Sequence, residues 1–251
     1  MIIRQQQIDT FEDTGSPHFE PRAVQHLKAS FPRHGAFLGD AGVIGVVRYA
    51  VEQAGQYGIA KAQNVQLFAD LTLLLGRFFD SDPQLPWAAA ALNDSETTCQ
   101  NRRSQRLHGE AMAYLNRVRG TKNEFIDKAQ ERLLTDPVAP ACGEFGPAVL
   151  MQLQRMFPEK YLELGEAGAR LLIAGGVERA ARYGIETPRG RLLYIGLMYL
   201  LGAGFDRDPL FAWAGEALAS GGTEAERVSR LHEFAVTYLK QWRALPARGQ
   251  A

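Results

Sequence analysis

Apolar residues recur along the chain at intervals of three and four, the pattern of helices that bury one face. One such run lies within a helix predicted from Asp40 to about Tyr57, where Gly58 stands at a position that favours a left-handed residue. No stretch shows the convincing alternation of apolar and polar residues that a half-buried strand requires. The pattern therefore predicts an all-α fold.

Two further predicted helices are the most apolar elements. The first covers about 62–76, and its counterpart begins at Thr187, a capping residue followed by proline. This counterpart is apolar on nearly every side from Leu192 to Leu201, and a helix without a polar face belongs in the interior. A last helix is predicted to start at Thr223, where Glu226 completes a capping box.

One stretch of the chain occurs twice. Residues 31–92 and 157–218 align without a gap at an offset of 126, and 25 of the 62 positions are identical. The shared residues include F-P, V-E-x-A-x-x-Y-G-I, L-L-G and F-D-x-D-P. Identity at this level indicates an internal duplication. We therefore expect two tandem repeated helical modules of about five helices each.

The repeat also suggests domain boundaries. Residues 1–119 form the first repeat with an N-terminal lead-in, and residues 148–251 form the second. Between them, residues 120–147 are a linker with one short helix, predicted from Glu124 to Leu134, and a loop rich in proline and glycine.

Charge and hydropathy narrow the classes of partner. Lys plus Arg and Asp plus Glu are equal at 28 each, so no overall field attracts nucleic acid or an anionic membrane. The most apolar segment, from Leu192 to Phe205, is shorter than the roughly 20 residues of a membrane span. The N-terminus lacks the apolar core of a signal peptide. We expect a cytoplasmic protein that binds neither nucleic acid nor membrane.

The two F-D-x-D-P motifs supply paired carboxylates, a residue type that suits metal binding or acid–base chemistry. These are Asp80 with Asp82 and Asp206 with Asp208. No histidine or glutamate stands beside them at ligand spacing. Because Asp82 and Asp208 each precede a proline, the favoured interpretation is that both are structural helix caps. No metal or cofactor site is predicted.

Catalytic residues are not predicted either. His108 and His232 occupy matched positions, and one histidine per repeat is too few for a zinc site. Cys99 and Cys142 form neither a disulfide framework nor a metal motif, which fits a reducing compartment. No serine, cysteine or histidine arrangement typical of a nucleophilic enzyme accompanies them. We expect a protein that is not an enzyme.

Differences between the copies suggest where a protein partner binds. The last helix of the first repeat is rich in arginine, which indicates either a solvated face or a patch for an acidic partner. Tyrosine and arginine are frequent at the energetic centres of interfaces. We therefore predict that a partner contacts the groove between the two halves through Tyr49, Arg102, Arg103 and Arg106.

The run YGIAKAQNVQLFADLTLLLGRFFDSDPQLPWAAAAL resembles a family of small helical bacterial proteins encoded beside type VI secretion effectors, PAAR-like spike-tip proteins and Rhs toxins. The family motifs correspond to Phe31-Pro32, to Tyr57-Gly58-Ile59 and to the stretch from Gly76 to Ala88. The match covers about residues 20–115. The second repeat matches more loosely, with Ala212 where the family has a proline before tryptophan.

The resemblance implies an accessory or adaptor protein that holds a type VI effector or its PAAR-like carrier before loading. It implies no catalytic residues. The alternative is an immunity protein that neutralises a cognate toxin by covering its active site. Under either reading the partner is another protein.

Overall fold

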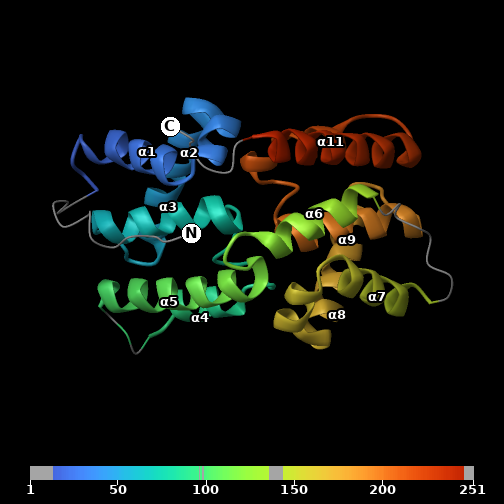
Figure 1. Cartoon of the computed structure of the whole chain (residues 1–251), viewed down its shortest axis with the longest axis horizontal. Helices are drawn as coiled ribbons and strands as arrows, with labels where there is room; N and C mark the ends of the chain where they lie inside the picture. The colour runs from blue at the N-terminus through green and yellow to red at the C-terminus, as the bar shows by residue number, and fades with distance from the viewer. Residues whose placement is uncertain (1–13, 96, 98, 136–143, 246–251) are drawn as a thin grey trace. The chain divides into compact units, whose positions relative to one another are not determined.

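The computed structural model describes residues 14–95, 97, 99–135 and 144–245. Within these ranges the chain forms helices joined by turns and contains no strand, which confirms the predicted all-α fold (Figure 1). None of the helices in the described part of the chain has the length and apolar character needed to span a membrane.

The helices have the following bounds in the structure. In chain order they are α1 (Phe19–Ser30), α2 (Pro32–Gln56), α3 (Ala62–Leu75), α4 (Pro86–Leu92), α5 (Gln100–Arg119), α6 (Glu124–Thr135), α7 (Phe145–Met156), α8 (Pro158–Arg182), α9 (Pro188–Leu201), the 3-10 helix η2 (Pro209–Phe211), α10 (Ala212–Ala219) and α11 (Glu224–Ala244). The helix predicted in the linker is α6. The starts of α1 and α7, of α2 and α8, and of α3 and α9 are each 126 residues apart.

The chain divides into two compact units whose boundaries cut across helices. Among the described residues, the first unit comprises 14–81, 86–111 and 241–245, and the second comprises Asp82–Leu85 and 112–240. The sequence-based division into 1–119, 120–147 and 148–251 follows the repeat and stays a prediction. The segment Asp82–Leu85 belongs to the second unit, although the residues on either side of it belong to the first. The end of α11 belongs to the first unit, although the rest of α11 belongs to the second.

The core of the first unit is formed by α1, α2 and α3, which pack on one another. Phe68 on α3 is fully buried and its ring lies 4.8 Å from that of Phe79, measured between centroids. In Figure 1, α3 runs between α2 and α5. The end of α11 also joins this unit, where the ring of Trp242 packs edge-on against His34 with 4.6 Å between centroids.

The core of the second unit is formed by α7, α8 and α9. The helix α9 is buried at every position from Leu192 to Leu200, as its apolar sequence predicts. Tyr194 packs on Phe205 with 5.1 Å between ring centroids. The predicted capping box is present at the start of α11, where Glu226 accepts from the Thr223 N–H at 2.8 Å.

The helix predicted to begin at Asp40 in fact begins at Pro32. The structure shows one element, α2, that bends at Gly39, where φ is 64° and ψ is −178°. The helix α8 bends in the same way at Gly165, with φ 69° and ψ 166°. Only glycine readily adopts this conformation, so a single glycine interrupts the helical backbone without ending the helix. The side chain of Asp40 pairs with Lys28 of α1.

Candidate functional site

Asp80 and Asp206, the first acids of the two motifs, are buried and engaged by tyrosine. Asp80 Oδ2 accepts from the Tyr57 hydroxyl at 2.9 Å and from Gln53 Nε2 at 2.7 Å. Asp206 Oδ2 accepts from the Tyr183 hydroxyl at 2.8 Å. Burial, followed by the neighbouring carboxylate, raises the pKa of both tyrosines to about 12, so each remains a donor at neutral pH. These carboxylates tie their motifs to the ends of α2 and α8.

Asp82 and Asp208, the second acids, accept hydrogen bonds from backbone N–H groups. Asp208 immediately precedes η2 and its Oδ1 accepts from the N–H of Leu210 at 2.9 Å. Asp82 Oδ1 accepts from the N–H of Gln84 at 2.8 Å, but α4 starts only at Pro86. Asp82 therefore closes a turn, whereas Asp208 stands at the start of a 3-10 helix. No group of three or more potential metal ligands occurs within the described ranges.

Tyr49, predicted to contact a partner, has a role within the first unit. Its hydroxyl donates to the carbonyl of Arg77 at 2.6 Å, and the Arg77 guanidinium lies 4.2 Å from its ring centroid. At the matched position in the second repeat, 126 residues on, the carbonyl of Ala203 accepts from Arg179 instead. Tyr49 and Arg179 thus each donate a hydrogen bond to a backbone carbonyl that lies just after a core helix.

The three arginines predicted beside Tyr49 lie on α5. Arg103 Nη1 donates to the carbonyl of Leu92 at 3.3 Å, and Arg106 Nη1 pairs with Asp94 at 2.9 Å. Arg102 is exposed. In the view of Figure 1, α3 lies between α5 and α2, the helix that carries Tyr49.

The large apolar side chains with the greatest exposure among the described residues belong to the second unit. On α8, Leu162 is 81% exposed and Leu171 is 70% exposed, one on each side of the bend, and Met151 on α7 is 61% exposed. The first repeat has Gln25, Ala36 and Gly45 at the three matched positions. Sequence reasoning missed these residues. A search of the aligned repeats for positions that carry a large apolar side chain only in the second copy finds Leu162 and Leu171, whereas Met151 lies before the aligned stretch.

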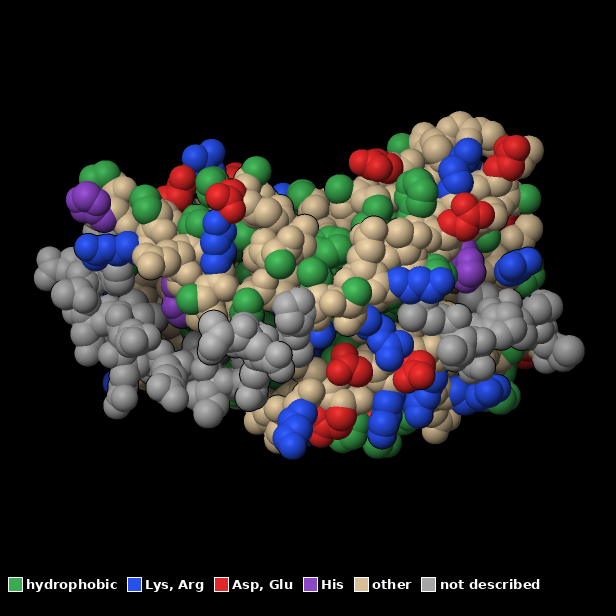
Figure 2. Space-filling view, turned by 45° about the horizontal axis from the view of Figure 1, so that its top comes forward, with side chains coloured by type: hydrophobic (Ala, Val, Ile, Leu, Met, Phe, Trp, Pro, Cys, Tyr) green, Lys and Arg blue, Asp and Glu red, His purple; other side chains and the backbone are tan. Residues whose placement is uncertain are grey.

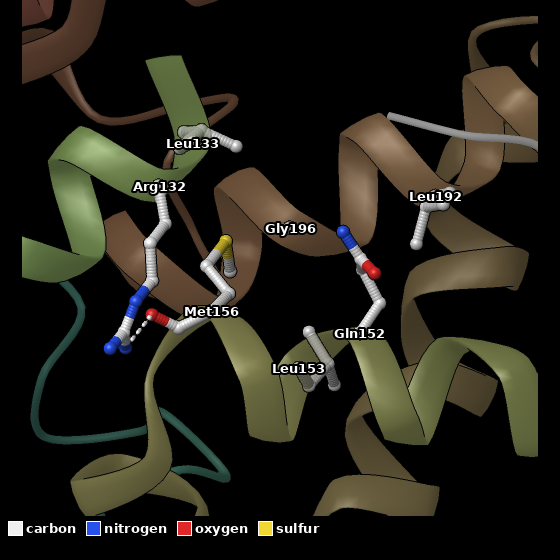
Figure 3. Close-up of a pocket in the computed structure, with 7 residues that line it drawn as sticks. All are labelled: Arg132, Leu133, Gln152, Leu153, Met156, Leu192 and Gly196. Atoms are coloured by element: carbon white, nitrogen blue, oxygen red, sulfur yellow. Dashed lines mark hydrogen bonds between the residues drawn. The ribbon is translucent and has the colours of Figure 1, made fainter. Parts of the chain in front are cut away.

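A small pocket opens between α6, α7 and α9 in the second unit (Figure 3). Its volume is about 20 Å³, enough for roughly one water molecule. Beside it, Arg132 Nη1 donates to the carbonyl of Met156 at 3.2 Å and holds α6 to the end of α7. The pocket is lined by Arg132, Leu133, Gln152, Leu153, Met156, Leu192 and Gly196. Its size does not suit an organic substrate.

The matched positions in the first unit carry a polar cluster instead. Asp70 on α3 is 1% exposed and accepts from Gln66 Nε2 at 3.0 Å. His26 Nε2 lies 3.3 Å from Asp70 Oδ1, and Ser30 Oγ lies 3.4 Å from the same nitrogen. A serine, a histidine and an aspartate thus meet. A catalytic triad needs both ring nitrogens, one for each partner, so this arrangement cannot relay a proton from Ser30 to Asp70.

The pKa values of this pair shift in the same direction. Burial raises the pKa of Asp70, and the contact with His26 opposes that rise. The contact with Asp70 raises the pKa of His26. Sequence reasoning missed the cluster because His26 lies before the aligned repeat and Asp70 is matched by Gly196.

A buried lysine lies at the end of α9. Lys160 donates to the carbonyl of Tyr199, and its Nζ lies 5.2 Å from the Tyr199 ring centroid. Burial lowers the pKa of Lys160 to about 8, while the charge of Asp82 opposes that shift. A cation near the last carbonyls of a helix complements the helix dipole. We therefore interpret Lys160 as a cap of α9.

The thiol of Cys99 is exposed and stands just before α5. Backbone N–H groups of Arg102 and Asn101 lower its pKa. Cys142 lies outside the described residues.

Figure 2 shows Lys and Arg side chains next to Asp and Glu on the face turned to the viewer, in keeping with the balanced composition.

Comparison of the chain with protein-family models, with curated proteins and with solved structures gives no match.

Proposed function

We propose that the chain is a duplicated helical scaffold that binds another protein and has no catalytic role of its own. In this proposal it acts in the cytoplasm as an accessory or adaptor of a type VI secretion effector, or of the PAAR-like carrier of that effector. The type of partner comes from the resemblance of residues 20–115 to proteins encoded beside such effectors. The observations below support protein binding by a duplicated scaffold.

Equivalent hydrogen bonds support the proposal of two tandem modules. The Tyr57–Asp80 bond has its counterpart in Tyr183–Asp206, at 2.9 and 2.8 Å. The bends at Gly39 and Gly165 are likewise 126 residues apart. Helix order, bend and buried contacts therefore recur at the spacing of the repeat, as expected if each copy folds by the same local rules.

The observation that carries the binding proposal is the exposure of Leu162, Leu171 and Met151. Burying a leucine side chain contributes about 1.5–3 kcal/mol, so a partner surface that covers these side chains gains binding free energy. The matched helix of the first repeat has alanine and glycine there. The exposed leucines are therefore specific to the second copy, as a partner site on a duplicated scaffold requires.

The buried carboxylates favour a structural interpretation over a catalytic one. Asp80 and Asp206 each accept from a tyrosine, and Asp82 and Asp208 accept from backbone N–H groups. A general acid or base must instead be able to reach a substrate proton. In the roles observed here, the four carboxylates hold turns and helix ends.

The binding proposal is tested with the products of the neighbouring genes. The double variant Leu162→Ala, Leu171→Ala is expected to bind its partner at least tenfold more weakly by calorimetry, because two buried side chains are lost from the interface. The variant Gln25→Ala, which matches Met151 in the first repeat and is exposed, is the control. Wild-type affinity in the folded double variant would refute the proposed surface.

A genetic experiment separates an adaptor from an immunity protein. Deleting the gene of an adaptor abolishes delivery of the effector and leaves the cell healthy. Deleting the gene of an immunity protein makes the cell sensitive to toxin from its siblings. Sensitivity with intact delivery would replace the adaptor proposal by the immunity alternative.

A further inference from the structure

We propose that the contact between α1 and α3 in the first unit is a pH-sensitive latch, in which protonation of His26 strengthens the hold of α1 on the buried carboxylate of Asp70. The latch consists of His26, Ser30, Gln66 and Asp70. It is independent of the identity of the protein partner.

The geometry places one titratable group of α1 against one of α3. The His26 side chain is 29% exposed, so protons from solvent reach it, whereas the Asp70 side chain is 2% exposed. His26 Nε2 is 3.3 Å from Oδ1 and 3.4 Å from Oδ2 of Asp70. Protonation of the ring turns a hydrogen bond between a neutral ring and a carboxylate into an ion pair in a poorly solvated site, where such contacts are stronger.

Three described residues act on the pair. Gln66 on α3 and Ser30 on α1 are neutral hydrogen-bonding neighbours of Asp70 and His26. On α5, His108 contributes an electrostatic interaction that lowers the pKa of Asp70. His26 and Asp70 interact directly, so they titrate as a coupled pair rather than as separate sites.

The direction of the effect follows from the raised pKa of His26. A histidine whose pKa is higher in the folded state contributes stability that is fully present below its unfolded value, near 6.5. That stability is lost as pH rises through the folded value. The latch is therefore tight in mildly acidic solution and weaker in mildly alkaline solution.

The second unit supplies an internal control. Gln152 on α7 and Gly196 on α9 stand where the first unit has His26 and Asp70, 126 residues earlier. Neither residue titrates. The contact of α7 with α9 therefore lacks this source of pH dependence, although its helices match α1 and α3 in length.

The test measures amide hydrogen exchange of the full chain at pH 6 and pH 8, with protection factors corrected for the intrinsic rate. Between these pH values we expect protection in α1 to fall about three- to tenfold relative to α7, because an ion pair is replaced by a hydrogen bond from a neutral ring. If the ratio of protection in α1 to protection in α7 is the same at both pH values, the proposal is overturned.

Two variants assign the effect to the pair. His26→Gln installs the residue found in the second repeat, and Asp70→Asn removes the charge with little change of shape. Both are expected to make the ratio independent of pH. His232→Gln, an exposed histidine on α11, is the control and should leave the pH dependence intact. A His26→Gln variant that keeps the wild-type pH dependence would contradict the assignment.

An NMR titration avoids relying on the folding of the variants. In the wild-type chain, the ring signals of His26 should titrate with a midpoint above 6.5. In Asp70→Asn the midpoint should fall, since its partner charge is gone. A wild-type midpoint below 6.5 would refute the latch, whatever the variants do.

Discussion

The carboxylate of Asp82 accepts a hydrogen bond from the backbone N–H of Ala203 at 2.7 Å, across 121 residues of chain. Its neighbour Gln84 donates from Nε2 to the carbonyl of Met198 at 2.9 Å. The segment Asp82–Leu85 therefore completes the end of α9, although in sequence it lies within the first copy of the repeat. A fragment that contains the second repeat alone lacks this segment.

Replacing Asp82 should cost more stability than replacing Asp208. Asp82→Ala leaves the N–H groups of Gln84 and Ala203 without their acceptor and removes a charge that favours protonated Lys160. We expect a loss of about 2–3 kcal/mol in the free energy of unfolding. Asp208→Ala, which loses a cap on η2, should cost about 1 kcal/mol. Urea denaturation of both variants measures the difference, and equal losses would contradict it.

Lys160 should make the chain more stable as pH rises from 8 to 9.5. Its pKa is lowered by burial to about 8, so in this range the unfolded chain binds more protons than the folded chain does. Stability then rises with pH by about 1.5 kcal/mol, because one pKa unit corresponds to about 1.4 kcal/mol and half of Lys160 is already neutral at pH 8. Denaturation at both pH values should show this rise in the wild type and lose most of it in Lys160→Met. An equal rise in stability in the wild type and in Lys160→Met would exclude Lys160 as the source of the rise.

The bend glycines should not tolerate a side chain. Gly39→Ala and Gly165→Ala place a β-carbon on a backbone with φ near +65°, which costs about 1–3 kcal/mol. Gly45→Ala is the matched control on α2, since Gly45 is helical and has open space around it. That control should gain about 0.5–1 kcal/mol. Thermal unfolding of the three variants distinguishes the outcomes, and a harmless Gly39→Ala would argue against the bend.

Arg102 provides the sharpest test of the partner surface predicted on α5. It is exposed, so Arg102→Ala leaves the Tyr49–Arg77 and Arg106–Asp94 contacts in place. If this surface contacts an acidic partner, affinity should fall about tenfold and the loss should shrink in high salt. Calorimetry at low and high salt measures both effects. Glu110→Ala is the control, since Glu110 is exposed on the same helix. Unchanged affinity of Arg102→Ala for the partner would exclude the predicted partner surface on α5.

The sequence by itself determined the helical class and much of the local structure. Three features act between residues a few positions apart: periodic apolar positions, glycines after helices and the capping box at Thr223. Each can therefore be predicted from the sequence without knowledge of the fold. The burial of α9 was equally predictable, since a helix with no polar face has no side to turn toward water.

The tertiary structure decided what the polar residues do. Tyr49 was a candidate for partner contact by its type, yet its hydroxyl satisfies a carbonyl that only the packing of α2 against α3 brings within reach. His26 and Asp70 meet across 44 residues, and Asp82 and Ala203 across 121. Such contacts depend on how helices pack, which the local pattern does not encode. The exposure of Leu162 and Leu171 likewise follows from the packing of α8, which buries their neighbours Leu172 and Ile173 and leaves these two side chains in solvent.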